Sequence, residues 1–213
     1  MMPVTLKQTA TTSRLLCAAC LRAQSGCICR WIVRLPTAIE VLILQHPAEL
    51  KHSKGSARLL HLCLPNSQLL VGEKFDEQLD ASLRQGGKTP ILLYPPFAEH
   101  GLDCLAPPPE LKPADLQKIE QLRLVILDGT WRKSRKMLYL NSALQALPRL
   151  SLHAVPESHY RIRKAHGVDQ LSSLEACCYA LMQLEANNRK YQPLLDTFDG
   201  FVNQIEQQSL RSQ

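Results

Sequence analysis

The chain has 213 residues, and 25 lysines and arginines against 19 acidic residues give it a net charge of +6 at neutral pH. This length fits one α/β domain with a small appendage, and the apolar runs are too short to cross a bilayer, so we expect no membrane segment. The positive excess favours a polyanionic partner, although many basic proteins bind no nucleic acid.

Four cysteines stand close together near the N-terminus, as Cys17-Ala-Ala-Cys20 and Cys27-Ile-Cys29. The N-terminus lacks the apolar core of a secretory signal, so we expect a cytoplasmic protein whose thiols stay reduced. Two close pairs of thiolates can complete a tetrahedral zinc site. The pattern therefore predicts structural zinc in a small N-terminal unit, residues 1–36. The alternative is four small buried residues, with one redox-active pair.

An apolar strand is predicted at Ile39–Leu44, and it runs into a polar loop, residues 45–56, that is rich in groups able to bind anions or line a site. His46 ends the strand and precedes Pro47, which favours an extended backbone. A histidine in this place is more often structural than functional. Further on, the pattern predicts strands at Gln68–Val71 and Ile91–Tyr94, and helices after residue 56 and at Asp76–Arg84.

The next strand, Leu124–Leu127, is followed by Asp128 and Gly129, and then by a helical pattern that begins at Trp131. Thr130 occupies the position of a helix N-cap. Open α/β sheets bind ligands at the carboxyl ends of their strands, so Asp128 and Gly129 are candidates for a site. The alternative is an ordinary turn between a strand and a helix.

Basic residues crowd the first turns of this helix, where cations oppose the helix dipole. A cluster placed against the local electrostatic preference favours an anionic partner such as phosphate. A second basic segment follows at Tyr160–His166. For both segments the alternative is a solvated surface. The basic residues are Arg132, Lys133, Arg135, Lys136, Arg161 and Arg163.

In the last part of the chain the residue pattern predicts a strand at Leu150–Val155 and a helical segment from Pro193. Between them it predicts a long helix that begins near Leu171, with Ser172 or Ser173 as its N-cap. About five strands alternate with helices, which predicts a mainly parallel sheet with helices on both faces. The sequence contains neither a Gly-x-Gly-x-x-Gly motif nor a P-loop.

The set of motifs resembles the DTW-domain family, the tRNA-uridine aminocarboxypropyltransferases. The Asp-x-Thr-Trp motif is short, but the whole set occurs in the order of the family. Two positions depart from the family pattern: Gly55-Ser56 stands in place of Asn-Thr, and Arg132 in place of proline. The matching elements are Cys17, Cys20, Cys27 and Cys29; His46-Pro47 with Glu49; Asp128-Gly-Thr-Trp131 with Arg135-Lys136-Met137; Tyr160-Arg161 with Arg163; and Leu171-Ser-Ser-Leu-Glu175.

The resemblance implies a SPOUT-like knotted α/β fold for residues 37–213 and binding of S-adenosylmethionine. It also implies transfer of the 3-amino-3-carboxypropyl group to N3 of a tRNA uridine, in the variable loop for bacterial members, with release of methylthioadenosine. The partners would be tRNA and S-adenosylmethionine, and we expect a monomer. The composition and the residue spacing by themselves show neither this fold, nor this cofactor, nor this reaction.

On the same basis, we expect Asp128 to be the catalytic residue, which accepts or helps to remove the N3 proton, or instead holds the ammonium group of the cofactor. The cofactor contacts would be Leu93, Tyr94, Gly129, Thr130, Trp131, Leu171, Ser172, Ser173, Leu174 and Glu175. The RNA contacts would be His46, Arg132, Lys133, Arg135, Lys136, Arg161 and Arg163.

Two other functions remain open at this point. An RNA methyltransferase would use the same cofactor but release S-adenosylhomocysteine. A non-catalytic zinc-containing RNA-binding protein would consume no cofactor.

Overall fold

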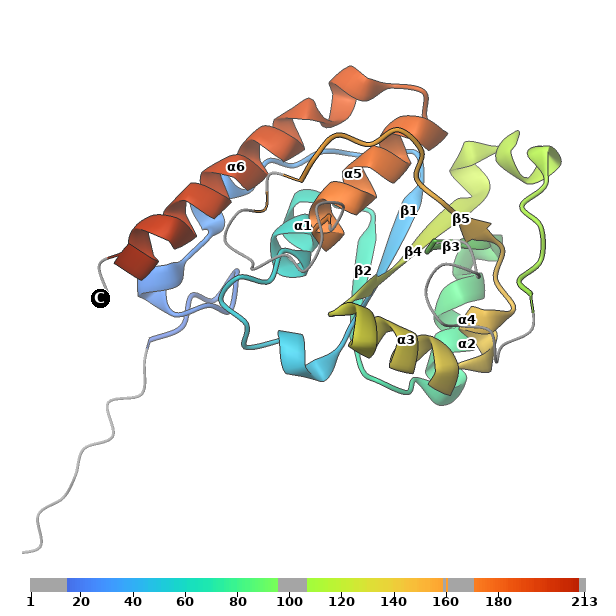
Figure 1. Cartoon of the computed structure of the whole chain (residues 1–213), viewed down its shortest axis with the longest axis horizontal. Coiled ribbons are helices and arrows are strands. Elements are labelled where there is room, and N and C mark those ends of the chain that lie inside the picture. Colours follow the sequence, from blue (N-terminus) through green and yellow to red (C-terminus); the bar gives the residue numbers. More distant parts are fainter. Residues whose placement is uncertain (1–14, 96–106, 159, 161–170, 211–213) are drawn as a thin grey trace, which may run out of the picture.

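Five parallel strands form one sheet at the centre of the molecule (Figure 1). The computed structural model describes residues 15–95, 107–158, 160 and 171–210. Within these ranges the strand order is β2-β1-β4-β3-β5, and every neighbouring pair is parallel, which confirms the predicted parallel sheet. The strands are β1 (Glu40–Gln45), β2 (Ser67–Val71), β3 (Thr89–Leu93), β4 (Leu122–Asp128) and β5 (Arg149–Leu150).

The central strand β4 is buried along its whole length. A strand that is covered on both faces needs a nearly continuous apolar run, and Leu124–Leu127 supplies it. Arg123 is the basic exception. Its guanidinium donates hydrogen bonds to the carbonyls of Ser82 and Gln85 and to the carboxylate of Glu40, which compensates the buried charge.

Helices cover both faces of the sheet, as predicted. Val41 and Ile43 pack with α1, α5 and α6, whereas Leu42 and Leu44 pack on the other face with α2, α3 and α4. This division follows from the alternation of side chains along a strand. The helices are α1 (Ala57–Cys63), α2 (Asp76–Arg84), α3 (Trp131–Leu140), α4 (Ser142–Gln145), α5 (Ser173–Leu184) and α6 (Asn188–Leu210).

Strand β5 is shorter than the predicted strand Leu150–Val155, since it ends at Leu150. In the described part of the chain it pairs with β3, and the amide of Tyr94 donates a hydrogen bond to the Leu150 carbonyl. Leu92 and Tyr94 are the residues that donate toward β5, and the next position in this alternation is Pro96, which has no amide hydrogen to donate.

Helix α6 begins earlier than predicted, at Asn188, so that Pro193 lies inside it. The Asn187 side chain accepts a hydrogen bond from the Lys190 amide at 3.2 Å near the start of the helix. Tyr191 and Leu194, on either side of the proline, are fully buried, and their packing offsets the backbone hydrogen bond that a proline removes.

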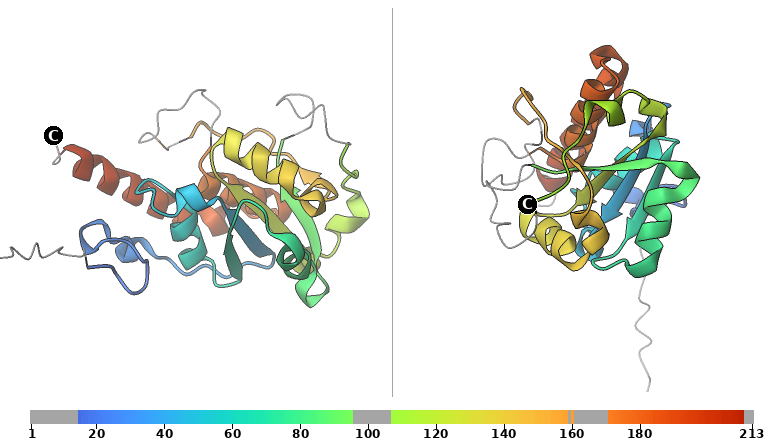
Figure 2. Two further views of the ribbon diagram at one scale, coloured as in Figure 1. Left: turned by 90° about the horizontal axis from the view of Figure 1, so that it is seen from below. Right: turned by 90° about the vertical axis from the view of Figure 1, so that its right-hand side faces the viewer.

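Residues 15–31 and the end of α6 lie at the same end of the molecule, away from α2 and α4 (Figures 1 and 2). Among the residues that the structure describes, none of the helices combines the length and the apolar composition needed to cross a membrane.

Candidate functional site

Asp128 ends strand β4 beside the end of strand β1. The two strands are parallel neighbours, and Gln45 pairs in register with Asp128. The chain leaves β1 toward β2 on one side of the sheet and leaves β4 toward β5 on the other. The carboxyl ends of β1 and β4 therefore flank a point where the strand order reverses, which is where open α/β sheets form a binding crevice.

The Asp128 carboxylate is buried and held in a fixed direction. Its exposed fraction is 6%. Oδ1 accepts a hydrogen bond from the Ser173 hydroxyl at 2.6 Å, and Oδ2 accepts one from the Gln45 side-chain amide at 2.8 Å. These two hydrogen bonds fix the direction of the carboxylate. A carboxylate held in this way can accept a proton or hold a cationic group.

A small pocket opens beside this carboxylate. On one side is the loop after β1, residues 46–56, called here the pocket loop; on the other is the start of α5. Gly129 lies between them, where a β-carbon would come within 3.1 Å of the Lys133 Cβ. A larger residue would therefore crowd the turn. The lining residues are Glu49, His52, Gly55, Ser56, Asp128, Gly129, Tyr160, Ser172 and Ser173.

The start of α5 is organised by a capping box. The Ser172 hydroxyl accepts from the Glu175 amide at 3.2 Å, and the Glu175 carboxylate accepts from the Ser172 amide at 2.8 Å. Glu175 is 1% exposed and also accepts from the Ser158 hydroxyl at 2.9 Å. The predicted N-cap is thus Ser172, and Ser173 is left to bond Asp128. Glu175, predicted to contact the cofactor, serves as a helix cap in this structure.

The turn after Asp128 also has the predicted form. Thr130 caps α3 by accepting from the Lys133 amide at 3.4 Å. Trp131 is 41% exposed and meets the buried ring of Tyr94 edge-on, with 5.8 Å between ring centroids. Burial raises the pKa of Tyr94, which keeps its hydroxyl protonated near neutral pH. The backbone N–H of Tyr94 donates to the Leu150 carbonyl of β5, so it is not available to a ligand.

Both lysines of the basic cluster on α3 have carboxylate partners within the protein. Lys133 contacts Glu49 at 2.7 Å, and Lys136 contacts Glu73 at 2.8 Å. Arg132 and Arg135 are exposed. Arg161 and Arg163, also predicted to contact RNA, lie outside the described residues.

His46 is held by its neighbours rather than turned to solvent. Nδ1 accepts a hydrogen bond from the Ala48 amide at 3.1 Å, and Nε2 lies 2.8 Å from a Glu73 oxygen. This network fits the neutral tautomer with the proton on Nε2, which then donates to Glu73. The hydrogen bonds of Lys136 and His46 lower the pKa of Glu73, so it stays ionised. The arrangement supports the structural reading of His46, while its RNA contact stays a prediction.

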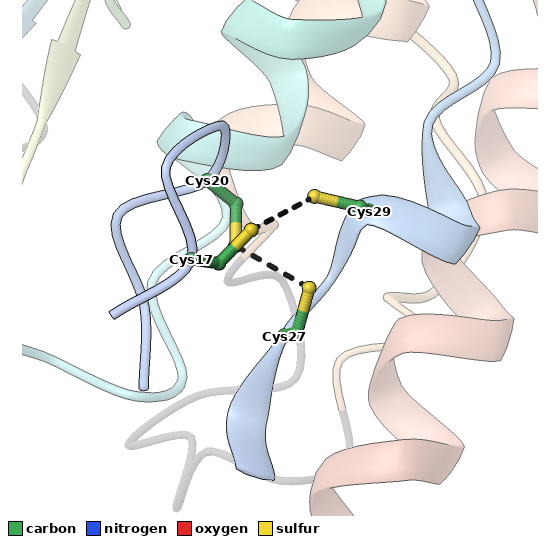
Figure 3. A group of neighbouring side chains, drawn as sticks. All are labelled: Cys17, Cys20, Cys27 and Cys29. Atoms are coloured by element: carbon green, nitrogen blue, oxygen red, sulfur yellow. Dashed lines mark hydrogen bonds between the residues drawn. The ribbon is translucent and has the colours of Figure 1, made fainter. Parts of the chain in front are cut away.

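The four N-terminal cysteines converge as their spacing predicts (Figure 3). The Sγ atoms of Cys17 and Cys29 are 3.5 Å apart, and those of Cys20 and Cys27 are 3.8 Å apart. All four sulfurs lie within 4.8 Å of one another. A tetrahedral zinc ion with Zn–S bonds of 2.3 Å places its sulfurs about 3.8 Å apart, so the cluster could hold such a metal ion.

The segment that carries these cysteines, residues 15–31, is called here the cysteine knuckle. It packs against α6, and its Ile28 is fully buried in the core. The Gln204 side chain accepts from the Trp31 indole at 2.6 Å and donates to the Cys27 carbonyl at 3.0 Å. Gly200 lies directly against the Trp31 ring, where no β-carbon would fit.

Sequence reasoning missed Glu73 and Arg22, and it included Gln45 only as part of the polar loop, without its contact to Asp128. This contact could have been found only by knowing that β1 and β4 are neighbours. Glu73 lies 27 residues after His46 and has no motif around it. Arg22 follows the first pair of cysteines without a motif of its own, but its side chain points to the pocket loop, where it donates to the carbonyls of Ser53 and Gly55.

The family model and the similar proteins indicate the same family for this chain. A family model described as the DTW domain matches residues 14–206. A protein of Macaca fascicularis named tRNA-uridine aminocarboxypropyltransferase 2 is 30% identical over 187 residues, which cover 84% of this chain and 59% of that protein. A protein of Drosophila melanogaster with the same name is 31% identical over 191 residues, covering 84% of this chain and 70% of that protein. No solved structure matches the chain.

Proposed function

The chain belongs to the DTW-domain family, and we propose that it is a tRNA-uridine aminocarboxypropyltransferase. Its donor would be S-adenosylmethionine and its acceptor N3 of a tRNA uridine. In the reaction N3 loses its proton and forms a bond to the aminocarboxypropyl carbon, while the bond from that carbon to sulfur breaks and methylthioadenosine leaves. Because the chain spans only about six tenths of the macaque relative, the activity named for that protein is a proposal here.

The observation that carries the proposal is the oriented Asp128 carboxylate at the reversal point of the sheet. Asp128 and Glu49 both line the pocket, and Ser56, Ser172 and Ser173 also line it. Acidic groups and hydroxyls suit a donor that carries a sulfonium and an ammonium group. The three carbons on that sulfonium are all electrophilic, so the carbon placed in line with the nucleophile decides which group is transferred.

We propose that Asp128 accepts the N3 proton of the uridine or helps to remove it. A neutral uridine N3 is a poor nucleophile, and a nearby carboxylate can remove its proton or hold the base in line through a hydrogen bond. The competing role for Asp128 is to bind the ammonium group of the donor. Asparagine at position 128 would separate the two roles, because its side-chain amide cannot take up the N3 proton.

The RNA would bind along the exposed side of α3, which begins directly at the pocket. Arg132 and Arg135 are exposed there and suit phosphates. Tyr139, 62% exposed on the same helix, offers a flat surface for an unpaired base.

The cysteine cluster would hold a structural zinc ion, since four thiolates fill a tetrahedral shell and leave no position for a substrate. The remainder of the chain would have the SPOUT-like knotted fold that the family resemblance implies.

Incubation with labelled S-adenosylmethionine and total tRNA, followed by nucleoside mass spectrometry, tests the function. The proposal predicts an aminocarboxypropyl-modified uridine and methylthioadenosine in equal amounts, both lost in Asp128→Ala. Methylated nucleosides with S-adenosylhomocysteine would indicate a methyltransferase instead. Binding of tRNA without any turnover would indicate a non-catalytic RNA-binding protein.

A further inference from the structure

Three successive carbonyls of the pocket loop receive hydrogen bonds from side chains that are distant in sequence. Arg22 donates to the carbonyls of Ser53 and Gly55 at 2.5 and 2.6 Å. The Tyr160 hydroxyl donates to the Lys54 carbonyl between them. These residues lie outside helices and strands, so regular secondary structure does not hold this main chain in place. Side chains from elsewhere in the fold supply that restraint.

Arg22 is itself fixed on its other side by the cysteine knuckle. Its carbonyl accepts from the Cys17 amide at 2.8 Å, which closes the turn that carries Cys17 and Cys20. Its guanidinium lies over the Phe201 ring of α6, 5.1 Å from the centroid. The side chain thus spans from the metal-binding turn to the loop, with an aromatic ring along its path.

The same loop forms one wall of the Asp128 pocket. His52, Gly55 and Ser56 line it. The Gly55 amide donates to the His52 carbonyl at 3.0 Å, and the Ser56 hydroxyl accepts from the Leu174 amide at 3.4 Å. A shift of the Gly55 carbonyl would therefore move the residues that face the ligand.

We propose that Arg22 is a positioning residue for the Asp128 pocket, and that the cysteine knuckle, folded around its metal, sets the shape of the pocket loop through Arg22. The planar guanidinium has two nitrogens directed at two carbonyls, an arrangement that a lysine ammonium cannot reproduce. Only the identity of the pocket's ligand, S-adenosylmethionine, rests on the proposed function.

The test compares Arg22→Lys with Arg30→Lys in the full, metal-loaded chain. Arg30 is the matched control because it belongs to the same knuckle but faces α6: its Nε donates to Gln204 at 3.1 Å, and its guanidinium lies over the Trp31 ring. Hydrogen exchange of residues 47–56, metal content, melting temperature and affinity for S-adenosylmethionine are measured for both variants.

We expect exchange in residues 47–56 to accelerate about tenfold in Arg22→Lys, the effect of losing one hydrogen bond to a charged group. Its dissociation constant for S-adenosylmethionine should rise by a similar factor, with metal content unchanged. Arg30→Lys should match the wild type in loop exchange and in this affinity.

Unchanged loop exchange in Arg22→Lys would overturn the proposal. Loss of metal from this variant together with affinity would also overturn it, since Arg22 would then only stabilise the knuckle. If the wild type binds no S-adenosylmethionine, the proposed function fails, but the exchange comparison between the two variants still decides the role of Arg22.

Discussion

At the scale of single residues, the direction of the Asp128 carboxylate is set by two other elements of the fold. Its donors are Gln45 at the end of β1 and Ser173 at the start of α5. Neither the turn after β4 nor its packing requires a carboxylate at this position, because asparagine would serve a turn nearly as well. A buried carboxylate at the carboxyl edge of the sheet is therefore better explained by a chemical role than by a role in the turn.

Replacement of Asp128 by asparagine separates these explanations. If the carboxylate handles the uridine proton, Asp128→Asn should fold and bind both substrates but transfer at least about a hundredfold more slowly. Raising the pH should restore part of the rate, since hydroxide removes the N3 proton without the carboxylate. Single-turnover rates against pH measure this, with Asp80→Asn on the exposed side of α2 as control. A near-normal rate for Asp128→Asn at neutral pH would end the proton-transfer role.

At the scale of elements, the start of α5 gives adjacent serines different tasks. Ser172 caps the helix, whereas Ser173 bonds the carboxylate of Asp128. Loss of an N-cap hydroxyl costs about 1 kcal/mol of stability. Ser172→Ala should thus lower the free energy of unfolding by about that amount. Ser173→Ala removes a donor to the buried Asp128 carboxylate and should slow transfer about tenfold, an effect on rate that Ser172→Ala should not share. Denaturant unfolding and single-turnover kinetics on both variants check this, and equal effects of the two changes on rate would contradict it.

Helix α3 carries the exposed residues Arg132 and Arg135 and also Lys133, which is largely buried against Glu49. Arg135→Ala should weaken tRNA binding. It should also reduce the slope of the logarithm of the affinity against the logarithm of the salt concentration by about one unit. Lys133→Ala should change this slope less, because Lys133 is paired with Glu49. Titrations at several salt concentrations measure both, with Arg84→Ala on α2 as an exposed basic control. An equal loss of slope in the Arg84 variant would show that the effect reflects net charge alone.

At the scale of the whole molecule, the sequence predicted what depends on neighbours along the chain. The Cys17–Cys29 spacing, the capped turn after Asp128 and the cap of α5 are local patterns, and the structure confirms them. Side-chain contacts between distant segments were not predictable, because no local pattern records which strands are neighbours. The hydrogen bond from Gln45 to Asp128 joins residues that are 83 positions apart in the sequence, and the one from Arg22 to Gly55 joins residues that are 33 positions apart. The resemblance identified the family, while the structure supplied the supports of the site.

The cysteine knuckle, whose four thiols could hold a metal ion, is packed into the main core of the fold. Ile28 belongs to the main core, and Trp31 packs on Gly200 and bonds Gln204 of α6. If the metal leaves, the four sulfurs lose their common partner, and the contacts between the knuckle and α6 should weaken with them. Metal removal should therefore affect more than the knuckle itself.

Removal of the metal should lower the melting temperature and shift the emission of Trp31 toward longer wavelengths, because its ring leaves the contact with Gly200. The background variant Trp131→Phe makes Trp31 the only tryptophan, since the chain has two. Cys17→Ser should reproduce both effects and reduce metal content. Cys178→Ala, a buried thiol outside the cluster, should lower stability through packing but keep the metal. Metal that remains stoichiometric in the Cys17→Ser/Cys29→Ser double variant would refute the site, because two thiolates cannot complete its tetrahedral shell.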